Sequence, residues 1–236
     1  MGVALQQFKE SVELASALKK LEREKYPAEP SLAQQPYVKG LRGGAAVLMV
    51  AAFEFFIRKL FEENISRLNT IPVSINFNKL PNELKVKAAF HGLKRAMDGP
   101  LFEEKLPKVD RINDIVQASK LLINDHINPE TFSETGGNPN SATVKEKFKD
   151  IGISDIFSVI KVSFEAKWGQ VVPGDFIKDK LDQIVRTRHV VAHTADTLNI
   201  SRSVQNESLK FLNIIAELLE KEMEKQVLHL KTIAKR

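Results

Sequence analysis

Apolar residues recur every three to four positions along most of the chain, which is the spacing of one face of an α-helix. The alternation that is typical of a half-buried strand appears only weakly, in IPVSINFN at 71–78. The pattern therefore predicts an all-α protein, a multi-helix bundle with long helices near both ends.

Interruptions of this pattern give the bounds of the predicted helices, because proline lacks a backbone donor and glycine favours turns. We expect helices over 2–25, 37–68, 81–97, 107–126, 154–168, 174–193 and 203 to the end. A short helix, capped by Ser141 or Thr143, is expected to end before Gly152. NPETFSETGGNPNSAT, at 128–143, is expected to be a loop. No repeat or linker stands out, so we expect one domain over 1–236, with 1–35 as an N-terminal helix and connector.

The longest apolar run, GGAAVLMVAAFEFFI at 43–57, is shorter than the roughly 20 residues of a membrane span and contains Glu54. We interpret it as a helix surrounded by other helices, and expect no membrane association. An unpaired carboxylate in such a run is costly. Three alternatives are therefore open for Glu54: it pairs with an arginine of the RTRHVVAHT segment at 186–194, it pairs with a partner elsewhere, or it lies on a ridge that faces solvent.

Composition narrows the function classes only slightly. The formal charge of +5 is spread over the whole chain, which permits a polyanionic partner without requiring one. The chain has no cysteine, which removes disulfides, thiolate metal sites and a cysteine nucleophile, and fits a reducing compartment. Charged residues interrupt the N-terminal stretch before it contains an apolar segment as long as that of a signal peptide, so we expect a cytoplasmic protein.

Common cofactor motifs are absent from the sequence. It has neither a phosphate-binding Gly-rich loop nor a His-Glu-x-x-His zinc motif, so we expect no cofactor. His189 and His193 stand four residues apart and could supply two zinc ligands from one helix face. Because the only nearby third ligand is Asp196, we expect no metal. His91, His126 and His229 are isolated and are expected to be surface or internally satisfied side chains.

The segment RTRHVVAHT, at 186–194, contains two arginines and two histidines and is the remaining candidate for a reactive site. An imidazole can move protons near neutral pH, and a guanidinium can hold a phosphate as its negative charge grows. These are the groups that cleavage of RNA without a metal requires, since the 2′-hydroxyl supplies the nucleophile. The same residues would also suit the C-terminal end of a helix, where cations complement the dipole. Spacing alone leaves both interpretations open.

RHVVAH, at 188–193, resembles the signature of the HEPN superfamily, whose members are all-α and often act as metal-independent endoribonucleases. LDQIVRTRHVVAHT, TGGNPNSATVKEKFKDIGI and GLRGGAAVLMVAAFEFFIRKL resemble segments of the branch associated with L-PSP-type endoribonucleases. The resemblance covers roughly residues 36–220.

The resemblance implies roles for individual residues. Arg188 would contact the scissile phosphate, and His193 would be the general acid or base. His189 replaces the usual asparagine and matches only as a polar residue, so its role as an orienting group or second proton carrier stays open. Arg186, Glu54 and Thr194 are the candidate supporting residues. Members with active sites usually pair as homodimers and leave 2′,3′-cyclic phosphate and 5′-hydroxyl ends.

Helix geometry raises a difficulty for this assignment. On a straight helix Arg188 and His193 point about 140° apart, whereas Arg186 and His193 differ by only about 20°. The family spacing accommodates either arginine. We favour Arg188, because a polar residue follows it, and expect the helix to break or tighten near Val191 or Ala192.

The sequence thus predicts a dimeric ribonuclease that acts on RNA, of bacterial phage-defence or toxin type, with an antitoxin or regulatory protein as a candidate partner. Ala195 stands where members paired with nucleotidyltransferase antitoxins have tyrosine, which disfavours that partnership. The alternatives are a non-catalytic module that dimerises or binds RNA or a nucleotide and regulates a partner protein, and a helical protein whose motif is only a helix end.

Overall fold

The computed structural model describes residues 2–70, 79–98, 107, 109–124, 126–194, 197 and 200–235. All regular structure in this part of the chain is helical, as the hydrophobic pattern predicts. In chain order the helices are α1 (Val3–Lys25), α2 (Gln35–Asn69), α3 (Asn82–Asp98), α4 (Ile112–Ile123), α5 (Pro129–Ser133), α6 (Ser141–Asp150), α7 (Ile156–Trp168), α8 (Phe176–Thr194) and α9 (Arg202–Lys235).

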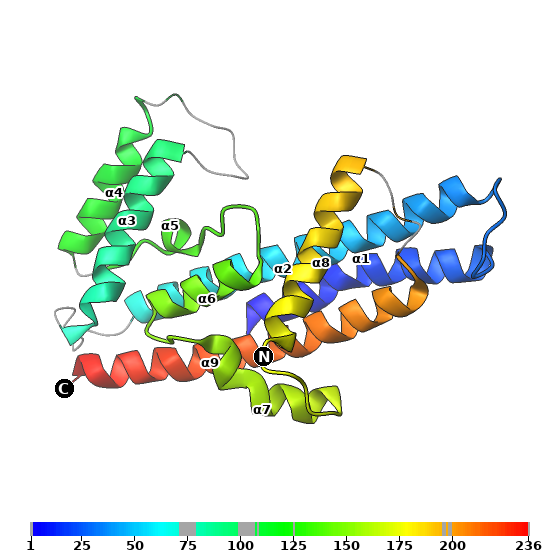
Figure 1. Ribbon diagram of the computed structural model, residues 1–236. Coiled ribbons are helices and arrows are strands. Elements are labelled where there is room, and N and C mark those ends of the chain that lie inside the picture. Colours follow the sequence, from blue (N-terminus) through cyan, green and yellow to red (C-terminus); the bar gives the residue numbers. More distant parts are fainter. Residues whose placement is uncertain are drawn as a thin grey trace.

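The three longest helices run along the length of the molecule (Figure 1). Helix α2 is central and packs against α1, α9, α8 and α5. The α3–α4 pair stands at one end, α7 lies against α9, and α8 crosses the long helices steeply so that its C-terminal end projects beyond them. This arrangement displays the end of α8, which carries the motif at 186–194.

Aromatic side chains fill the core in three groups. Phe8 of α1 contacts Phe53 and Phe56 of α2, with ring centroids 6.4 and 5.4 Å apart. Further along α2, the ring of Phe61 meets those of Phe132 and Phe148. In the third group Trp168 stacks on Phe164 and meets Phe176 and Phe211, which joins α7, α8 and α9. Burying side chains of this size supplies most of the stabilisation of the bundle.

Helix α2 explains the long apolar run. Among the described residues it is the one helix long and apolar enough to cross a membrane by length and composition, yet most of the relevant window is buried inside the protein. Neighbouring helices cover it on several sides, which is what an apolar helix at the centre of a bundle requires. The run is thus accounted for by the core of the fold.

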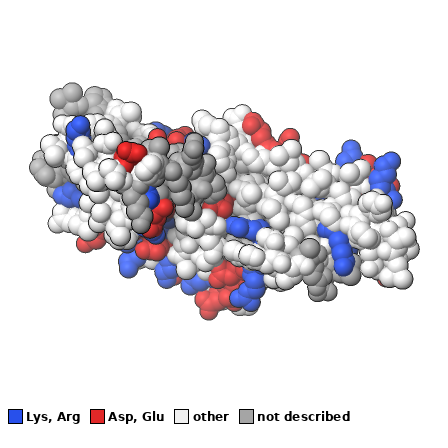
Figure 2. All heavy atoms as spheres, turned by 90° about the horizontal axis from the view of Figure 1, so that it is seen from above, with Lys and Arg blue, Asp and Glu red and all other residues white. Residues whose placement is uncertain are grey.

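Charged side chains of both signs are spread over the surface. Figure 2 shows Lys and Arg interspersed with Asp and Glu on the face seen from above, without one large patch of a single sign. A polyanion would therefore have to be held at particular sites on this face and not by a broad positive field.

The predicted helix bounds agree with the structure within two residues except around α4 and α5. Helix α4 begins at Ile112 instead of 107, because the Pro107 carbonyl accepts hydrogen bonds from the amides of Asp110 and Arg111 in a turn that precedes the helix. It ends at Ile123, three residues before the predicted end. The weak strand predicted at 71–78 lies outside the described residues.

The predicted loop at 128–143 is wrong in part, because it contains α5. The Asn128 side chain caps this helix by accepting hydrogen bonds from the amides of Glu130 and Thr131, and Pro129 occupies its first turn. The predicted cap of α6 is also corrected. Asn140, not Ser141 or Thr143, is the N-cap, and its side chain accepts from the Thr143 amide.

Candidate active site at the end of α8

The apolar stripe of α8 decides which side of the motif faces the protein. Ile177, Leu181, Ile184 and Val185 are buried, and they repeat at three- and four-residue steps. Arg188 follows in the same register and therefore points toward the protein. The helix continues to Thr194, so the predicted break near Val191 or Ala192 does not occur.

Arg188 joins α8 to α2 and to the loop between α5 and α6. Its Nη2 donates to the Gly137 carbonyl at 2.9 Å and lies 3.5 Å from Oε2 of Glu54. Its side chain is 23% exposed, whereas Glu54 is buried. Of the three alternatives open for Glu54, the structure shows the pair with an arginine of the motif.

Burial dominates the electrostatics of Glu54. It raises the pKa of the carboxyl above its ordinary value, although the hydrogen bond that Thr135 Oγ1 donates to Oε1 at 3.2 Å and the charges of Arg188 and Arg58 act the other way. The ionised carboxylate is therefore held at a cost, which Arg188 reduces. Removing Arg188 would therefore leave the Glu54 carboxylate buried without this compensating charge.

The loop that meets Arg188 is held in a specific shape. Gly136 and Gly137 both have positive φ, +73° and +77°, a conformation that other residues rarely adopt. At the end of the loop the Asp182 carboxylate on α8 accepts hydrogen bonds from the Ser141 amide at 2.7 Å and its hydroxyl at 2.8 Å. The loop is thus attached to α8 at two points, Arg188 and Asp182.

The other motif residues lie toward solvent. Arg186 and His193 are exposed and His189 is half-buried. On the continuous helix Arg186 and His193 lie on one side, about 20° apart. The imidazoles of His189 and His193 are nearly parallel, with centroids 6.4 Å apart. Thr194 Oγ1 donates to the Val190 carbonyl, one turn back in the helix.

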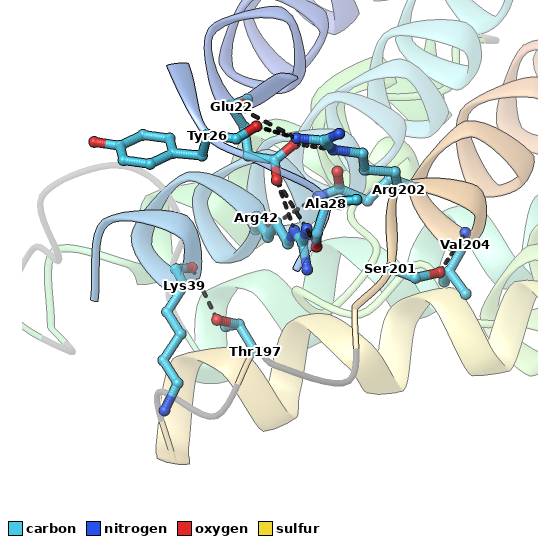
Figure 3. Close-up of polar contacts among 10 residues, drawn as sticks. Glu22, Tyr26, Ala28, Lys39, Arg42, Thr197, Ser201, Arg202 and Val204 are labelled. Carbon is cyan, nitrogen blue, oxygen red and sulfur yellow. Dashed lines mark hydrogen bonds and ion pairs between the residues drawn. The ribbon is translucent and has the colours of Figure 1, made fainter. Parts of the chain in front are cut away.

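Contacts with α2 fix the end of α8. Thr197, in the connection to α9, donates to the Lys39 carbonyl at 2.9 Å (Figure 3). A Cβ on Gly43 would come within 2.8 Å of the Thr197 side chain and 3.1 Å of Val191. Only a residue without a side chain allows α2 to approach α8 this closely. The exposed motif is therefore carried on a firmly seated helix.

A buried ion-pair cluster fastens the start of the next helix. The Glu22 carboxylate, 1% exposed, accepts from Arg42 of α2 at 2.8 and 3.1 Å and from Arg202 of α9 at 2.8 Å (Figure 3). Arg202 also donates to the Tyr26 carbonyl at 2.7 Å. These bonds link α1, α2 and α9 beside the α8–α9 connection.

The remaining histidines do not join the motif. His91 Nε2 lies 3.0 Å from Asp150 Oδ2, and His126 Nδ1 approaches the Asn124 carbonyl, while His229 is exposed. The expectation of surface or satisfied histidines is confirmed. Within the described residues no group of three or more His, Asp or Glu side chains is arranged to hold a metal ion. Asp196 and Ala195 lie outside these residues.

Sequence reasoning missed the parts of this site that come from the loop. Thr135 and Gly137 supply a hydroxyl to Glu54 and a carbonyl to Arg188, and Asp182 holds the loop. The consecutive glycines at 136 and 137 were a signal for an unusual turn. Nothing in the spacing showed that this turn meets α8.

Comparison with known proteins agrees with the geometry. No curated protein and no solved structure matches the chain. A family model described as RiboL-PSP-HEPN matches residues 8–225, which includes α2, the loop before α6 and the whole of α8. The chain therefore belongs to the RiboL-PSP-HEPN family of the HEPN superfamily.

Proposed function

We propose that the protein is a metal-independent endoribonuclease that cleaves RNA by attack of the neighbouring 2′-hydroxyl and leaves 2′,3′-cyclic phosphate and 5′-hydroxyl ends. One observation carries the proposal. In a chain of the RiboL-PSP-HEPN family, α8 presents Arg186 and His193 on its exposed side, with Arg188 at its base. Bacterial defence or a toxin system is the setting that we propose for this activity.

His193 is assigned proton transfer. Its ring is open to solvent and can approach a 2′-hydroxyl or a leaving 5′-oxygen without displacing core residues. His189 lies parallel to it one turn away and can orient the same phosphate or carry a second proton. The mechanism takes one proton from the 2′-oxygen and returns one to the 5′-oxygen, so the imidazoles are regenerated.

The arginines are assigned to the phosphate. Arg188 supports the growing charge from the base of the site, where Glu54 and Gly137 hold its guanidinium. Arg186 lies on the same side of the helix as His193 and offers a second, exposed guanidinium. From the family signature we expect Arg188→Ala to abolish cleavage, and from the place of Arg186 on the His193 side of α8 we expect Arg186→Ala to weaken it.

Incubation with RNA in EDTA tests the proposal. Wild type is expected to cleave, whereas His193→Ala and Arg188→Ala are expected to lose cleavage and keep their helical circular dichroism. Exposed His229, on the far part of α9, supplies the matched control, since His229→Ala should cleave like wild type. Full cleavage by the His193→Ala protein would refute the assignment.

We further propose that two copies of the chain form the site. An open groove of about 600 Å³ is lined by Gly40, Val47, Val191 and neighbouring residues, and Val190, which precedes Val191 in the chain, is 44% exposed. A second copy seated there would cover this apolar surface and bring two motifs into one cleft. One domain over the whole chain is part of this proposal.

Light scattering during gel filtration tests the dimer. We expect twice the 26.6 kDa of one chain, and dissociation in Val190→Asp. Val171→Asp is the control, because Val171 is also exposed but lies between α7 and α8, away from the motif. A wild-type protein that elutes as a monomer at micromolar concentration would contradict the dimer.

The alternative is a non-catalytic module that dimerises or binds RNA or a nucleotide and regulates a partner protein, such as an antitoxin. The engagement of Arg188 with Glu54 and Gly137 favours it, since a guanidinium held by the protein has fewer donors left for a substrate. Binding of RNA without turnover, unchanged by His193→Ala, would support this alternative over the enzyme.

A further inference from the structure

A recess between α1 and α9 gathers positive charge away from the motif. It has a volume of about 200 Å³ and is lined by Ser16, Lys19, Lys20, Glu22, Arg23, Arg202, Gln205 and Asn206. Four of these residues are cationic and one is anionic. We call it the α1–α9 recess. Figure 3 shows two of its members, Glu22 and Arg202, beside the start of α9.

The one carboxylate of the recess is already occupied. Both oxygens of Glu22 accept hydrogen bonds from guanidinium groups, Oε1 from Arg42 and Oε2 from Arg202. The Glu22 pKa shows the same balance, because burial raises it but the hydrogen bonds from Arg202 and Arg42 outweigh burial and leave it below its ordinary value. Glu22 is therefore not available to neutralise the lysines.

The cations contributed by α1 are left with little compensation. Among the described residues neither Lys19 nor Arg23 forms an ion pair, and Lys20 only approaches Glu24 at 3.9 Å. Lys19 is half-buried, and burial followed by the charge of Arg23 lowers its pKa. Like charges held together in this way favour a bound anion. The anion would reduce both the cost of burying Lys19 and the repulsion between Lys19 and Arg23.

The other wall of the recess is also suited to an anion. It is the N-terminal end of α9, a 34-residue helix whose dipole favours negative charge, with the amides of Val204 and Gln205 already donating to Ser201. Ser16 and Asn206 add a hydroxyl and an amide, while Arg202 is fixed by its bonds to Glu22 and Tyr26. Donors held in place, lysines that reach solvent and a helix terminus are the usual elements of a phosphate site.

Position connects the recess to the motif. Arg202 follows His193 by nine residues, so the two lie no more than about 30 Å apart even if the connection were fully extended. A volume of 200 Å³ suits one phosphate group with part of its sugar better than a complete nucleotide. This separation sets an upper limit of about 30 Å on the stretch of RNA that would join the two sites.

We propose that the α1–α9 recess binds a backbone phosphate of RNA at a distance from the bond that is cut. The inference rests on the proposed function for its ligand, and it assigns Lys19, Arg23 and Arg202 to holding the strand. These residues do not touch the bond that is cleaved, so they contribute affinity and register without taking part in the chemistry.

Salt-dependent binding of a fluorescent 20-nucleotide RNA tests the inference. The His193→Ala background prevents cleavage during the measurement. The variant Lys19→Gln/Arg23→Gln removes two cations, and Lys221→Gln/Lys149→Gln is the control, with the same loss of charge at exposed positions outside the recess. We expect the recess variant to keep its helical content, since the substitutions remove repulsion.

For the recess variant we expect affinity to fall about tenfold in 50 mM salt, for all RNA sequences alike. The slope of log affinity against log salt should shrink by about 0.7 for each phosphate of the single strand that the variant no longer neutralises. The control should keep the wild-type slope. Equal effects in both variants would overturn the inference, because only net charge would then matter.

Two further results separate this inference from the proposed function. Wild type that cleaves RNA while the recess variant binds it normally would overturn the recess and leave the ribonuclease standing. Weakened RNA binding by the recess variant, in a protein that never cleaves, would support the recess and refute the ribonuclease. If inorganic phosphate or adenosine monophosphate bound the recess as tightly as the 20-nucleotide RNA, the assignment to an RNA strand would be wrong.

Discussion

The pair formed by Arg188 and Glu54 gives the most informative stability experiment. Replacing Arg188 by alanine removes the hydrogen bond to the Gly137 carbonyl and leaves Glu54 buried without its nearest cation. Replacing Glu54 by glutamine instead keeps an oxygen for Thr135 and removes the charge that burial penalises. The two substitutions break one interaction, but we expect them to differ in cost.

The magnitude follows from the geometry. Two charges 3.5 Å apart attract by roughly 5 kcal/mol at an effective dielectric constant of about 20, and desolvation offsets much of this. A hydrogen bond from a charged donor adds about 1.5–3 kcal/mol. We expect Arg188→Ala to lower the free energy of unfolding by about 2–4 kcal/mol at pH 7. Glu54→Gln should change it by less than about 1 kcal/mol, and the double variant should be more stable than Arg188→Ala alone.

The dependence on pH has a definite sign. Because the Glu54 pKa is raised, the folded protein holds this proton more tightly than the unfolded chain, and stability falls as pH rises through the raised pKa. The loss of unfolding free energy caused by Arg188→Ala should therefore become larger from pH 4 to pH 7. In the double variant, which also carries Glu54→Gln, this loss should not depend on pH. Urea unfolding followed by circular dichroism at 222 nm measures both. The reasoning is refuted if Glu54→Gln costs as much as Arg188→Ala at pH 7.

Three further substitutions test other parts of the structure. Glu22→Gln should lower the free energy of unfolding by about 2–4 kcal/mol, because Arg42 and Arg202 lose their shared counter-charge. The wild-type advantage should shrink as pH falls through the lowered pKa of the Glu22 carboxyl, and an advantage in urea unfolding that stays constant as the pH is lowered would contradict this. Gly136→Ala and Gly169→Ala, at φ +73° and +95° with open space around both, should each cost about 1–2 kcal/mol, but only the first should impair RNA cleavage. Equal cleavage by both alanine variants would show that the loop does not position Arg188.

Most of the helices were predictable because each buries one face, and the apolar residues of that face recur every three to four positions in the sequence. Helix α2 was predictable from its long apolar run, because neighbouring helices cover it on several sides. The same reasoning extends to the orientation of Arg188, which continues the stripe of Ile184 and Val185. The predicted break near Val191 came from requiring Arg188 and His193 to share a side. The chain keeps a regular helix, so these two residues point in different directions, and Arg186 lies on the same side as His193, about two turns away.

The contacts that complete the site are distant in sequence, and spacing cannot reveal them. Thr135 and Glu54 are 81 residues apart, Gly137 and Arg188 are 51 apart, and Arg202 and Glu22 are 180 apart. The short helix α5 was missed for another reason. Its Asn128–Pro129 start is a proper cap, but the many turn-forming residues that follow favoured a loop over a five-residue helix.

The chemistry of the product ends tests the central claim most directly. A uniform RNA is incubated in EDTA with wild type and with His193→Ala, and the fragments are analysed by mass spectrometry beside an RNA that has a 2′-deoxy residue at the cleavage site. The account predicts 2′,3′-cyclic phosphate and 5′-hydroxyl ends that depend on His193, and no cleavage at the deoxy position. Fragments with 5′-phosphate ends, or cyclic phosphate ends produced equally by His193→Ala, would contradict it.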